Sequence, residues 1–405
     1  MTNTYDQVRY PGMAFPQTHP DRLATIAILH GMEPAPVDAC RVLELGCGIG
    51  GNLIPMANQL PDSVFVGLDL SESAIQHGRQ IVAALGMKNV ELRCGDIMEV
   101  GPDEGQFDYI IAHGVYSWVP PFVREKIFSI LKHNLAPAGV AYLSYNCYPG
   151  AHLRNIARDL MVYHVRGIDD SREQIQQARA AMKFLHEANV EHETYRAVVC
   201  EQFERVSKTP DEVLFHDDLE EVSVPFYLHE VVEAARRHGL QYMSETDYSY
   251  ADLRDWPEEV ARVLRNIPDE EVVAREQYLD FVRCRAFRQT LLCREHIKLR
   301  RSVDSEVIKR FYLATPVLPA NNGPVDPAAE ETVEFRRDKK GTMSINSPMV
   351  KAAILALSER WPEDVGFAEL VQLSRDKLGE DFFADAEKLE TEVDTLAEAL
   401  FRAFV

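Results

Sequence analysis

The stretch that decides the fold is Arg41-Val42-Leu43-Glu44-Leu45-Gly46-Cys47-Gly48-Ile49-Gly50-Gly51-Asn52. Its apolar start predicts a buried strand, which breaks into a glycine-rich turn before a helix begins at about Asn52. Glycine lets the backbone pass close to a bound molecule, because it has no Cβ atom. The free N–H groups at the start of the following helix point at the same place. The stretch therefore predicts a site for a nucleotide-like cofactor.

Strands and helices alternate around this turn, after a first helix over residues 21–31. The predicted strands are 42–46, 64–69, 90–94, 107–112 and 139–145, and the helices between them are 52–60, 71–86 and 123–135. The fourth strand is a continuous apolar run, as expected in the middle of a parallel sheet. This order predicts an α/β fold with a doubly wound, Rossmann-like sheet.

A polar, helix-prone stretch from about residue 153 to 205 then interrupts the alternation. We interpret it as a helical insertion that covers the site or forms a homodimer contact; the alternative is a spacer that only adds packing surface. The alternation resumes with a helix at 226–238, a strand at 240–246, helices over 252–282 and a strand at 287–293. We assign 1–152 and 220–297 to the cofactor-binding domain, 153–219 to the insertion, and 298–405 to a linker plus C-terminal domain.

The C-terminal region is predicted to be a small α+β domain that resembles a winged helix. Residues 314–330 are rich in Pro, Ala and Asn and have the composition of a linker. A hairpin is expected over 333–346, turning at Lys339-Lys340-Gly341, and two or three helices follow it. Acidic residues outnumber basic ones after residue 347, which is the wrong sign for gripping phosphates. Scaffolding or protein contact is therefore the better interpretation.

The composition narrows the classes of partner. The 405 residues carry a net charge of −21, which disfavours nucleic acid and anionic membranes and would attract a basic substrate such as a lysine-rich protein. The plainer interpretation is that the acidity only maintains solubility. The seven cysteines include no CxxC pair, so neither a disulfide framework nor a zinc site is indicated. We expect a cytoplasmic protein with no metal and no stable membrane insertion, since the start lacks a signal-peptide pattern.

Two cofactor classes fit the glycine-rich turn. The spacing Gly46-x-Gly48-x-x-Gly51 also satisfies the dinucleotide fingerprint, so this motif alone is a weak signal. Asp69, at the end of the second strand, can accept hydrogen bonds from two ribose hydroxyls. NAD enzymes share that feature, so the residues up to this point leave a dinucleotide and S-adenosylmethionine both open.

A resemblance to class I methyltransferases favours S-adenosylmethionine. Glu44-x-Gly46-x-Gly48-x-Gly50 resembles their first motif, whose loop cradles the amino-acid part of the cofactor. Cys94-Gly95-Asp96-Ile97 matches their adenine-binding position, where the Asp meets the adenine amino group and an apolar residue covers the ring. The order of strands and helices, with two late strands, matches their seven-stranded sheet. The cofactor-binding residues implied are Glu44, Gly46, Gly48, Gly50, Asn52, Asp69, Leu70, Asp96, Ile97 and His113.

Longer runs narrow this resemblance to one group. Three runs are similar to bacterial methyltransferases that carry a methyltransferase regulatory domain. They are Phe15-Pro16-Gln17-Thr18-His19-Pro20, residues 107–120 and Ser144-Tyr145-Asn146-Cys147-Tyr148-Pro149-Gly150. That group includes protein-lysine methyltransferases that act on outer-membrane proteins of rickettsiae. The match spans roughly residues 5–300. It implies a protein acceptor, and a small-molecule methyltransferase or a cofactor-binding regulator without turnover is the alternative.

The ends of the fourth and fifth strands are predicted to hold the acceptor. Methyl transfer needs the nucleophile, methyl group and sulfur in line, with the nucleophile neutral. We expect Tyr116 and Trp118 to shape the acceptor slot and His113 to position the acceptor or take its proton. Tyr145 and Asn146 are expected to contact the acceptor. The alternatives are ordinary packing for the aromatic residues, a hydrogen-bonded strand end for His113 and a turn cap for Asn146.

Two further segments carry weaker interpretations. The aromatic N-terminus, with Tyr5, Tyr10, Phe15 and Thr18, is interpreted as a lid over the cofactor or otherwise as a docked arm. His216-Asp217-Asp218 superficially suggests metal ligands. Because the three are adjacent and lack a spaced partner set, they are expected to form a solvated loop.

Overall fold

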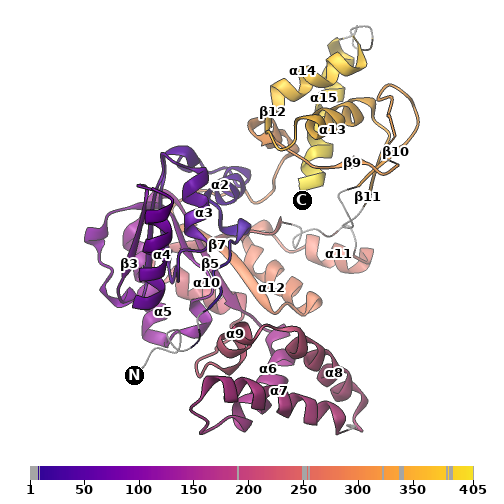
Figure 1. Cartoon of the computed structure of the whole chain (residues 1–405). Coiled ribbons are helices and arrows are strands. Elements are labelled where there is room, and N and C mark those ends of the chain that lie inside the picture. The colour runs from indigo at the N-terminus through magenta and orange to yellow at the C-terminus, as the bar shows by residue number, and fades with distance from the viewer. Residues whose placement is uncertain are drawn as a thin grey trace. The chain divides into compact units, whose positions relative to one another are not determined.

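The computed structural model describes residues 8, 10–188, 191–248, 253, 256–321, 323–336, 342–379, 382 and 386–404 (Figure 1). They belong to two compact units, Met1–Arg301 and Ser302–Val405, which are described separately. Tyr5, placed by the sequence in the aromatic N-terminus, and the expected turn at residues 339–341 lie outside the described residues.

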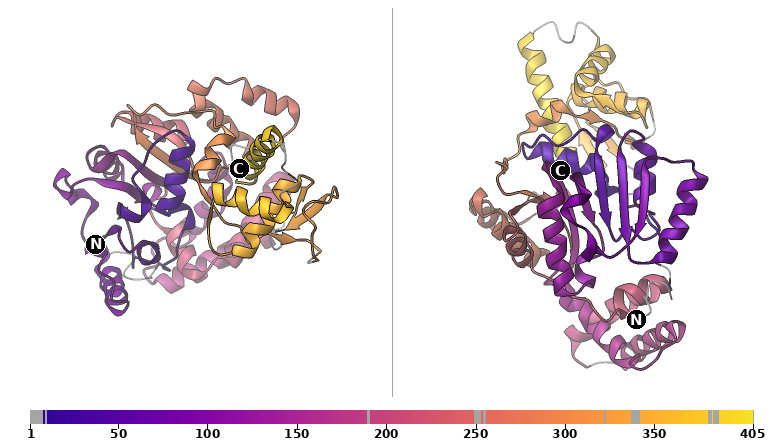
Figure 2. Two further views of the ribbon diagram at one scale, coloured as in Figure 1. Left: turned by 90° about the horizontal axis from the view of Figure 1, so that it is seen from above. Right: turned by 90° about the vertical axis from the view of Figure 1, so that its left-hand side faces the viewer.

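The first unit is built on one seven-stranded sheet, shown face-on in the right panel of Figure 2. Its strands are β1 (Arg41–Leu45), β2 (Val64–Asp69), β3 (Val90–Cys94), β4 (Phe107–Ala112), β5 (Leu135–Asn146), β6 (Leu240–Glu245) and β7 (Phe287–Arg294). Their order is β3-β2-β1-β4-β5-β7-β6. Strands β1 to β5 pair in parallel, and β7 runs antiparallel to both β5 and β6. This mixed sheet confirms the predicted Rossmann-like class I methyltransferase fold.

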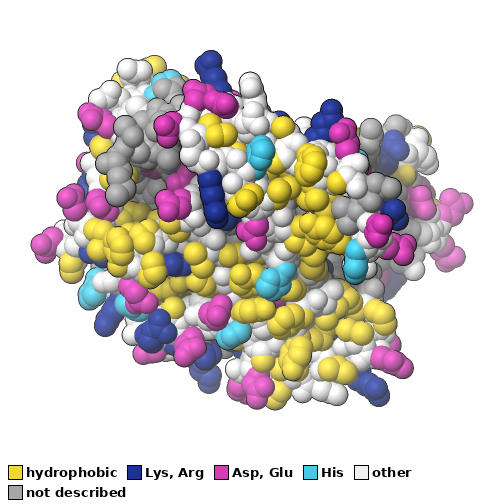
Figure 3. All heavy atoms as spheres, turned by 90° about the horizontal axis from the view of Figure 1, so that it is seen from below, with side chains coloured by type: hydrophobic (Ala, Val, Ile, Leu, Met, Phe, Trp, Pro, Cys, Tyr) yellow, Lys and Arg dark blue, Asp and Glu magenta, His cyan; other side chains and the backbone are white. Residues whose placement is uncertain are grey.

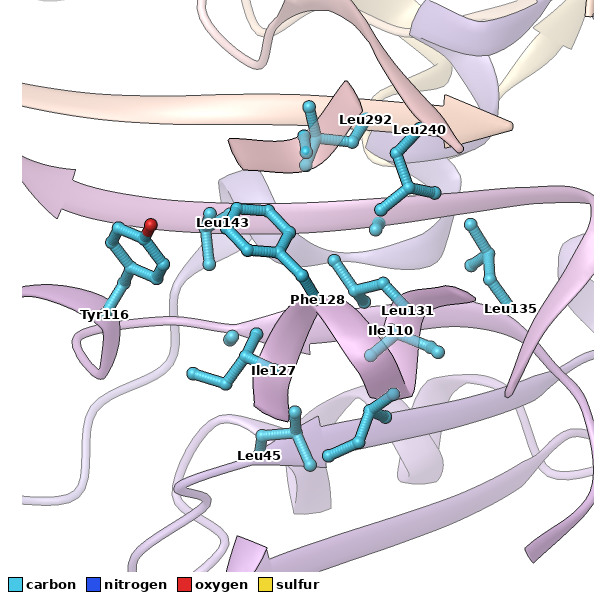
Figure 4. Close-up of a cluster of buried hydrophobic side chains, with 14 of the residues drawn as sticks. Leu45, Ile110, Tyr116, Ile127, Phe128, Leu131, Leu135, Leu143, Leu240 and Leu292 are labelled. Carbon is cyan, nitrogen blue, oxygen red and sulfur yellow. The ribbon is translucent and has the colours of Figure 1, made fainter. Parts of the chain in front are cut away.

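Helices cover both faces of the sheet, because successive strand residues point to opposite sides. Val42 packs on one side with α2 (Pro20–Leu29), α3 (Leu53–Gln59) and α4 (Glu72–Ala84). Leu43 packs on the other with α5 (Pro121–Asn134) and α10 (Leu228–Arg236). Figure 4 shows the second cluster, where Phe128 and Leu131 of α5 meet Ile110 and Leu143 of the sheet. The strand β5 begins at Leu135, earlier than the predicted residue 139, since Leu135 already pairs with Phe107.

The stretch expected to be helical forms a group of helices with its own core, near the bottom of Figure 1. Its elements are α6 (Gly150–His164), α7 (Ser171–Glu187), α8 (Glu193–Lys208), α9 (Asp211–Leu214) and the π-helical turn η6 (Phe215–Leu219). The chain then returns to the sheet, where the Val224 N–H donates to Ser117 O at 2.9 Å and the Phe226 N–H to Asn146 O at 3.0 Å. These bonds fix the insertion beside the carboxyl ends of β4 and β5. Helices α11 (Glu258–Arg265) and α12 (Val272–Arg283) lie between β6 and β7 in the chain.

The second unit combines short strands with three longer helices. Its elements are η9 (Ser305–Arg310), β8 (Tyr312–Leu313), β9 (Leu318–Pro319), β10 (Val333–Arg336), β11 (Thr342–Ile345), α13 (Pro348–Arg360), β12 (Val365–Gly366), α14 (Phe367–Leu378) and α15 (Ala386–Phe404). The predicted hairpin is present as antiparallel β10 and β11. Residues 314–330 differ from a plain linker, because β9 pairs with β10 and the buried Lys351 Nζ donates to the carbonyls of Ala329 and Glu331.

Two global features bear on the expectations from composition. All seven cysteines are free thiols. In the part of the chain that the structure describes, no helix has the length and apolar character required to cross a bilayer.

Candidate active site

A cavity of about 450 Å³ opens at the carboxyl edge of the sheet, beside the glycine-rich turn. Most of the predicted cofactor residues line it, as expected for a doubly wound fold, in which ligands bind beyond the carboxyl ends of the strands. The predicted residues that the structure brings together here are Glu44, Gly46, Gly48, Asn52, Asp69, Leu70, Asp96, Ile97, His113 and Trp118. Gly50, Tyr116, Tyr145 and Asn146 do not line it.

The turn after β1 adopts a backbone that favours glycine. Gly46, Gly48 and Gly50 have φ angles of 76°, 53° and 77°. A Cβ atom on Gly48 would meet nothing within 4 Å, so the left-handed backbone alone accounts for glycine there. Gly50 faces Ile54 and Leu92 instead of the cavity, so the expectation that it contacts the cofactor is corrected to a role in shaping the turn.

Asp69, at the end of β2, ties two loops together. Its Oδ2 accepts the Gly48 N–H at 2.8 Å and its Oδ1 accepts the Ser71 N–H at 2.9 Å. An ionised carboxylate offers about four lone-pair directions, more than these two backbone bonds use. The side chain is therefore held in one orientation while it still presents acceptors to the cavity, as a pair of ribose hydroxyls requires.

Glu44 is a buried carboxylate at the base of the cavity, 3% exposed. Its Oε1 accepts from the Asn52 side-chain amide at 2.7 Å, while its Oε2 has no hydrogen-bond partner among the described residues. Burial is the main cause that raises the pKa of Glu44 to about 7; the Asn52 hydrogen bond opposes this rise and the charge of Asp69 adds to it. A buried oxygen without a partner is costly. It fits the ammonium group of an amino acid bound in the cavity.

The far end of the cavity is lined by Leu70, Asp96 and Ile97. The Leu70 side chain is 63% exposed, which leaves an apolar surface at the cavity for a flat ring. Asp96 caps the 3₁₀ helix Ile97–Glu99, because its Oδ1 accepts the Met98 N–H at 2.9 Å. The cap orients the Asp96 carboxylate, whose other oxygen is available to an exocyclic amino group.

His113 follows β4 and lies half-buried in the cavity wall. Its Nδ1 lies 2.9 Å from Tyr142 Oη and 3.2 Å from Ser144 Oγ, and its ring packs on Phe15 at a centroid distance of 3.9 Å. Burial lowers the pKa of His113 to about 4, so the ring is neutral at physiological pH. A neutral, fixed imidazole can orient a neighbouring group without adding positive charge beside a cationic cofactor.

The N-terminal arm crosses the glycine-rich turn. The Asn52 Oδ1 accepts the Phe15 N–H at 2.9 Å, and Thr18 Oγ1 lies 3.0 Å from Asn52 Nδ2, the atom that also donates to Glu44. Gly12 passes so close that a Cβ atom on Gly51 would lie 2.7 Å from the Gly12 Cα. Tyr10, Pro11, Gly12, Met13 and Phe15 all line the cavity. The docked arm is thus a wall of the site.

We expect Gly51→Ala to raise the dissociation constant of S-adenosylmethionine about tenfold, because the new methyl group meets backbone and lifts the arm, at a cost of roughly 1–3 kcal/mol. Gly12→Ala is the matched control. Its Cβ would meet the flexible Ile49 side chain, with the nearest atom at 2.5 Å, and should have a smaller effect. Isothermal titration calorimetry measures both; equal affinity in Gly51→Ala and wild type would show that the arm does not contribute to binding.

Tyr116 and Tyr145 are packing residues, which corrects their assignment to the acceptor slot. Tyr116 is 4% exposed, and its ring packs on Phe226 at 5.1 Å and Phe128 at 5.6 Å, as Figure 4 shows in part. Tyr145 is 1% exposed and pairs with Thr290 at 3.0 Å. Asn146, also away from the cavity, uses its backbone N–H to donate to Ser117 Oγ at 2.9 Å and its carbonyl to hold the returning insertion.

His216-Asp217-Asp218 is not the solvated loop that the sequence suggested. It forms the π-helical turn η6, where His216 is 3% and Asp218 0% exposed, and His216 and Asp217 line the cavity. Its burial comes from distant partners: Asp218 pairs with Arg154 and Arg205, and His216 Nε2 lies 2.6 Å from Val8 O. Among the described residues, no three His, Cys, Asp or Glu side chains gather as a metal site.

The residues present fit S-adenosylmethionine. Glu44 offers an unpartnered oxygen to its ammonium group, Asp69 offers acceptors to its ribose, and Leu70, Asp96 and Ile97 offer an apolar surface and a carboxylate to its adenine. When bound, the cofactor supplies an electrophilic methyl group. Neutral His113 and the aromatic side chains of Phe15 and Trp118 then provide a wall without positive charge on the acceptor side.

Two family models match the chain. A methyltransferase domain matches residues 42–139, and a predicted methyltransferase regulatory domain matches residues 210–294. The second match includes β6 and β7, so part of the region named regulatory completes the sheet. Of the curated relatives, RP789 of Rickettsia prowazekii, an uncharacterised protein, is 37% identical over 93% of this chain and 68% of its own length. RP028 of the same organism, also uncharacterised, is 35% identical over 58% of this chain and 94% of its own.

A solved structure is similar over almost the whole chain. PKMT2 from Rickettsia typhi in complex with AdoHcy has a TM-score of 0.84 and 30% identity, and the match covers 98% of this chain and 76% of PKMT2. AdoHcy is the cofactor after its methyl group has left. The similarity therefore extends through the insertion and the C-terminal unit, well beyond the cofactor-binding strands.

Proposed function

Because the chain belongs to the class I S-adenosylmethionine-dependent methyltransferases with a methyltransferase regulatory domain, we propose that its methyl acceptor is a lysine side chain of a protein. The observation that carries the proposal is the similarity to PKMT2 over 98% of this chain. It agrees with the resemblance of the sequence to a group that includes protein-lysine methyltransferases. A shared cofactor domain alone would leave the acceptor open, whereas here the insertion beside the acceptor side of the cavity is shared as well.

Charge and surface chemistry support a protein acceptor. The net charge of −21 attracts a lysine-bearing partner. Figure 3 shows hydrophobic side chains gathered in patches among acidic and basic ones on one face of the molecule. Phe122, which lines the cavity, exposes 62% of its surface. Homodimer formation and the absence of nucleic-acid binding stay predictions.

The proposed chemistry is an in-line displacement. A neutral lysine Nζ attacks the methyl carbon with its lone pair, and the carbon–sulfur electron pair stays on sulfur. Since a free lysine has a pKa of about 10.4, the site must hold the ammonium and allow it to lose a proton. We propose that His113 and Trp118 face this acceptor, because both line the cavity after β4.

Labelling a cell extract tests the acceptor class. The protein is incubated with methyl-labelled S-adenosylmethionine and extract, and proteins are separated from small molecules. Label in the protein fraction supports the proposal. Label in the small-molecule fraction alone would contradict it and favour a small-molecule acceptor; cofactor binding without transfer to either fraction would favour a regulator.

A further inference from the structure

Asp217, an acidic residue of the insertion, lines the cavity. It lies on the π-helical turn that the insertion holds over the carboxyl ends of β4 and β5. The cofactor residues described above come from the other side of the site, from the loops after β1, β2 and β3. Asp217 is therefore on the acceptor side.

The neighbouring arginines do not neutralise this carboxylate by direct bonds. Arg154 Nε donates to Asp218 Oδ1 at 3.0 Å, and Arg205 makes two bonds of 2.9 Å to the same Asp218. The remaining bond from Arg154 goes to the backbone carbonyl of Asp217, at 2.9 Å. In the described part of the chain, no hydrogen bond or ion pair reaches the Asp217 side chain. The position of Asp217 is fixed by the bond to its backbone carbonyl and by the ion pairs of Asp218, and the carboxylate oxygens of Asp217 remain available.

Aromatic rings stand beside it. Tyr10 packs against His216 at a centroid distance of 5.6 Å, and Tyr10, His216 and Trp118 line the cavity together with Asp217. A lysine side chain has an aliphatic stem that packs on rings and a charged end that needs a carboxylate. Burial raises the pKa of Asp217 to about 6, so the carboxylate is mostly ionised at neutral pH yet poorly solvated. A small cation bound beside Asp217 would stabilise this poorly solvated carboxylate.

We propose that Asp217 is the residue that binds the ammonium group of the acceptor lysine. The inference rests on the proposed function. It accounts for a half-buried acid whose side chain accepts no hydrogen bond in the described part of the chain, although the charges of Arg154 and Arg205 lower its pKa. The other carboxylates of the cavity, Glu44, Asp69 and Asp96, belong to the cofactor side. Asp217 favours a primary ammonium over a neutral nucleophile, because an ammonium group can donate a charged hydrogen bond to the side chain, which Arg154 and Arg205 do not.

The test uses n-butylammonium as the smallest mimic of a lysine side chain. It is titrated into the 405-residue protein saturated with AdoHcy at constant ionic strength and followed by ligand-observed NMR. We expect Asp217→Asn to raise its dissociation constant at least tenfold and to leave 1-butanol binding and AdoHcy affinity unchanged. Glu212→Gln is the matched control, because it removes the same charge from an exposed position on α9 and should leave n-butylammonium binding unchanged.

Equal n-butylammonium affinity in wild type and Asp217→Asn, or no binding to wild type, would overturn the inference. A parallel loss of AdoHcy affinity would also overturn it, since Asp217 would then serve the cofactor. These results are distinct from failure of the proposed function. If wild type still labels extract proteins on lysine but binds n-butylammonium as tightly as Asp217→Asn does, the assignment of Asp217 fails and the proposed function stands.

Discussion

Asp69→Ala should weaken S-adenosylmethionine binding by two to three orders of magnitude, the largest effect that we expect. The substitution removes the acceptors for two ribose hydroxyls and also the two bonds, of 2.8 and 2.9 Å, that hold the Gly48 and Ser71 amides. Hydrogen bonds to a charged group contribute about 1.5–3 kcal/mol each, and each 1.4 kcal/mol is a tenfold change in affinity.

Calorimetric titration of the cofactor measures the Asp69→Ala effect directly. Asp103→Ala is the control, because Asp103 is an exposed acid in the 3₁₀ helix Pro102–Glu104 and does not line the cavity. Its affinity should equal that of wild type. Asp69→Asn should fall between the two, since the amide keeps one acceptor. An Asp69→Ala protein that binds with wild-type affinity would contradict the placement of the ribose.

Glu44→Gln should remove a large pH dependence from the stability of the ligand-free protein. The pKa of Glu44 rises from 4.5 to about 7 on folding, so proton binding favours the folded state. This contribution is fully present below pH 4.5 and is lost as the pH rises through 7. A shift of that size corresponds to about 3 kcal/mol. The unfolding free energy of wild type minus that of Glu44→Gln should fall by this amount across the range.

Chemical denaturation of both proteins at several pH values measures the Glu44 effect. Taking the difference cancels other buried acids with raised pKa values, such as Asp217 and Asp280. Cofactor binding should show the reverse trend: below pH 7 the wild-type dissociation constant rises, because protonated Glu44 no longer attracts an ammonium group. Parallel stability curves for the two proteins would show that Glu44 is not the buried, unpartnered acid described here.

The sheet, and the gathering of most predicted cofactor residues at one cavity, were predictable from sequence because their signals are local. Apolar runs of strand length marked β1 to β4, and the glycine turn and Asp69 follow their strands at fixed distances. Position relative to a strand end is enough to place these residues at the carboxyl edge. The same reasoning failed for Tyr116 and Tyr145. Position at a strand end places a residue at the carboxyl edge of the sheet, but it does not show whether the aromatic ring points into the cavity or packs in the core. Phe226, distant in sequence, decides that for Tyr116.

The acceptor side of the cavity was less predictable. His216 and Asp217 enter the wall because Arg154 and Arg205 hold Asp218 and because Val8 and Tyr10 reach across from the N-terminus. Each of these contacts joins segments far apart in the chain, and adjacent polar residues carry no local signal for them. The adjacent residues His216-Asp217-Asp218 were noted in the sequence only for a superficial likeness to metal ligands. The aromatic composition of the N-terminal arm, by contrast, led to the interpretation that the arm covers the site, and the arm lines the cavity.

The central claim is methyl transfer to lysine from a cofactor held in this cavity. The most direct measurement is to incubate wild type and Asp69→Ala with methyl-labelled S-adenosylmethionine and extract proteins, hydrolyse the proteins completely and identify the labelled amino acid. The account predicts label in N-methylated lysine with wild type and almost none with Asp69→Ala. Label in any other amino acid, or equal lysine label with both proteins, would contradict it.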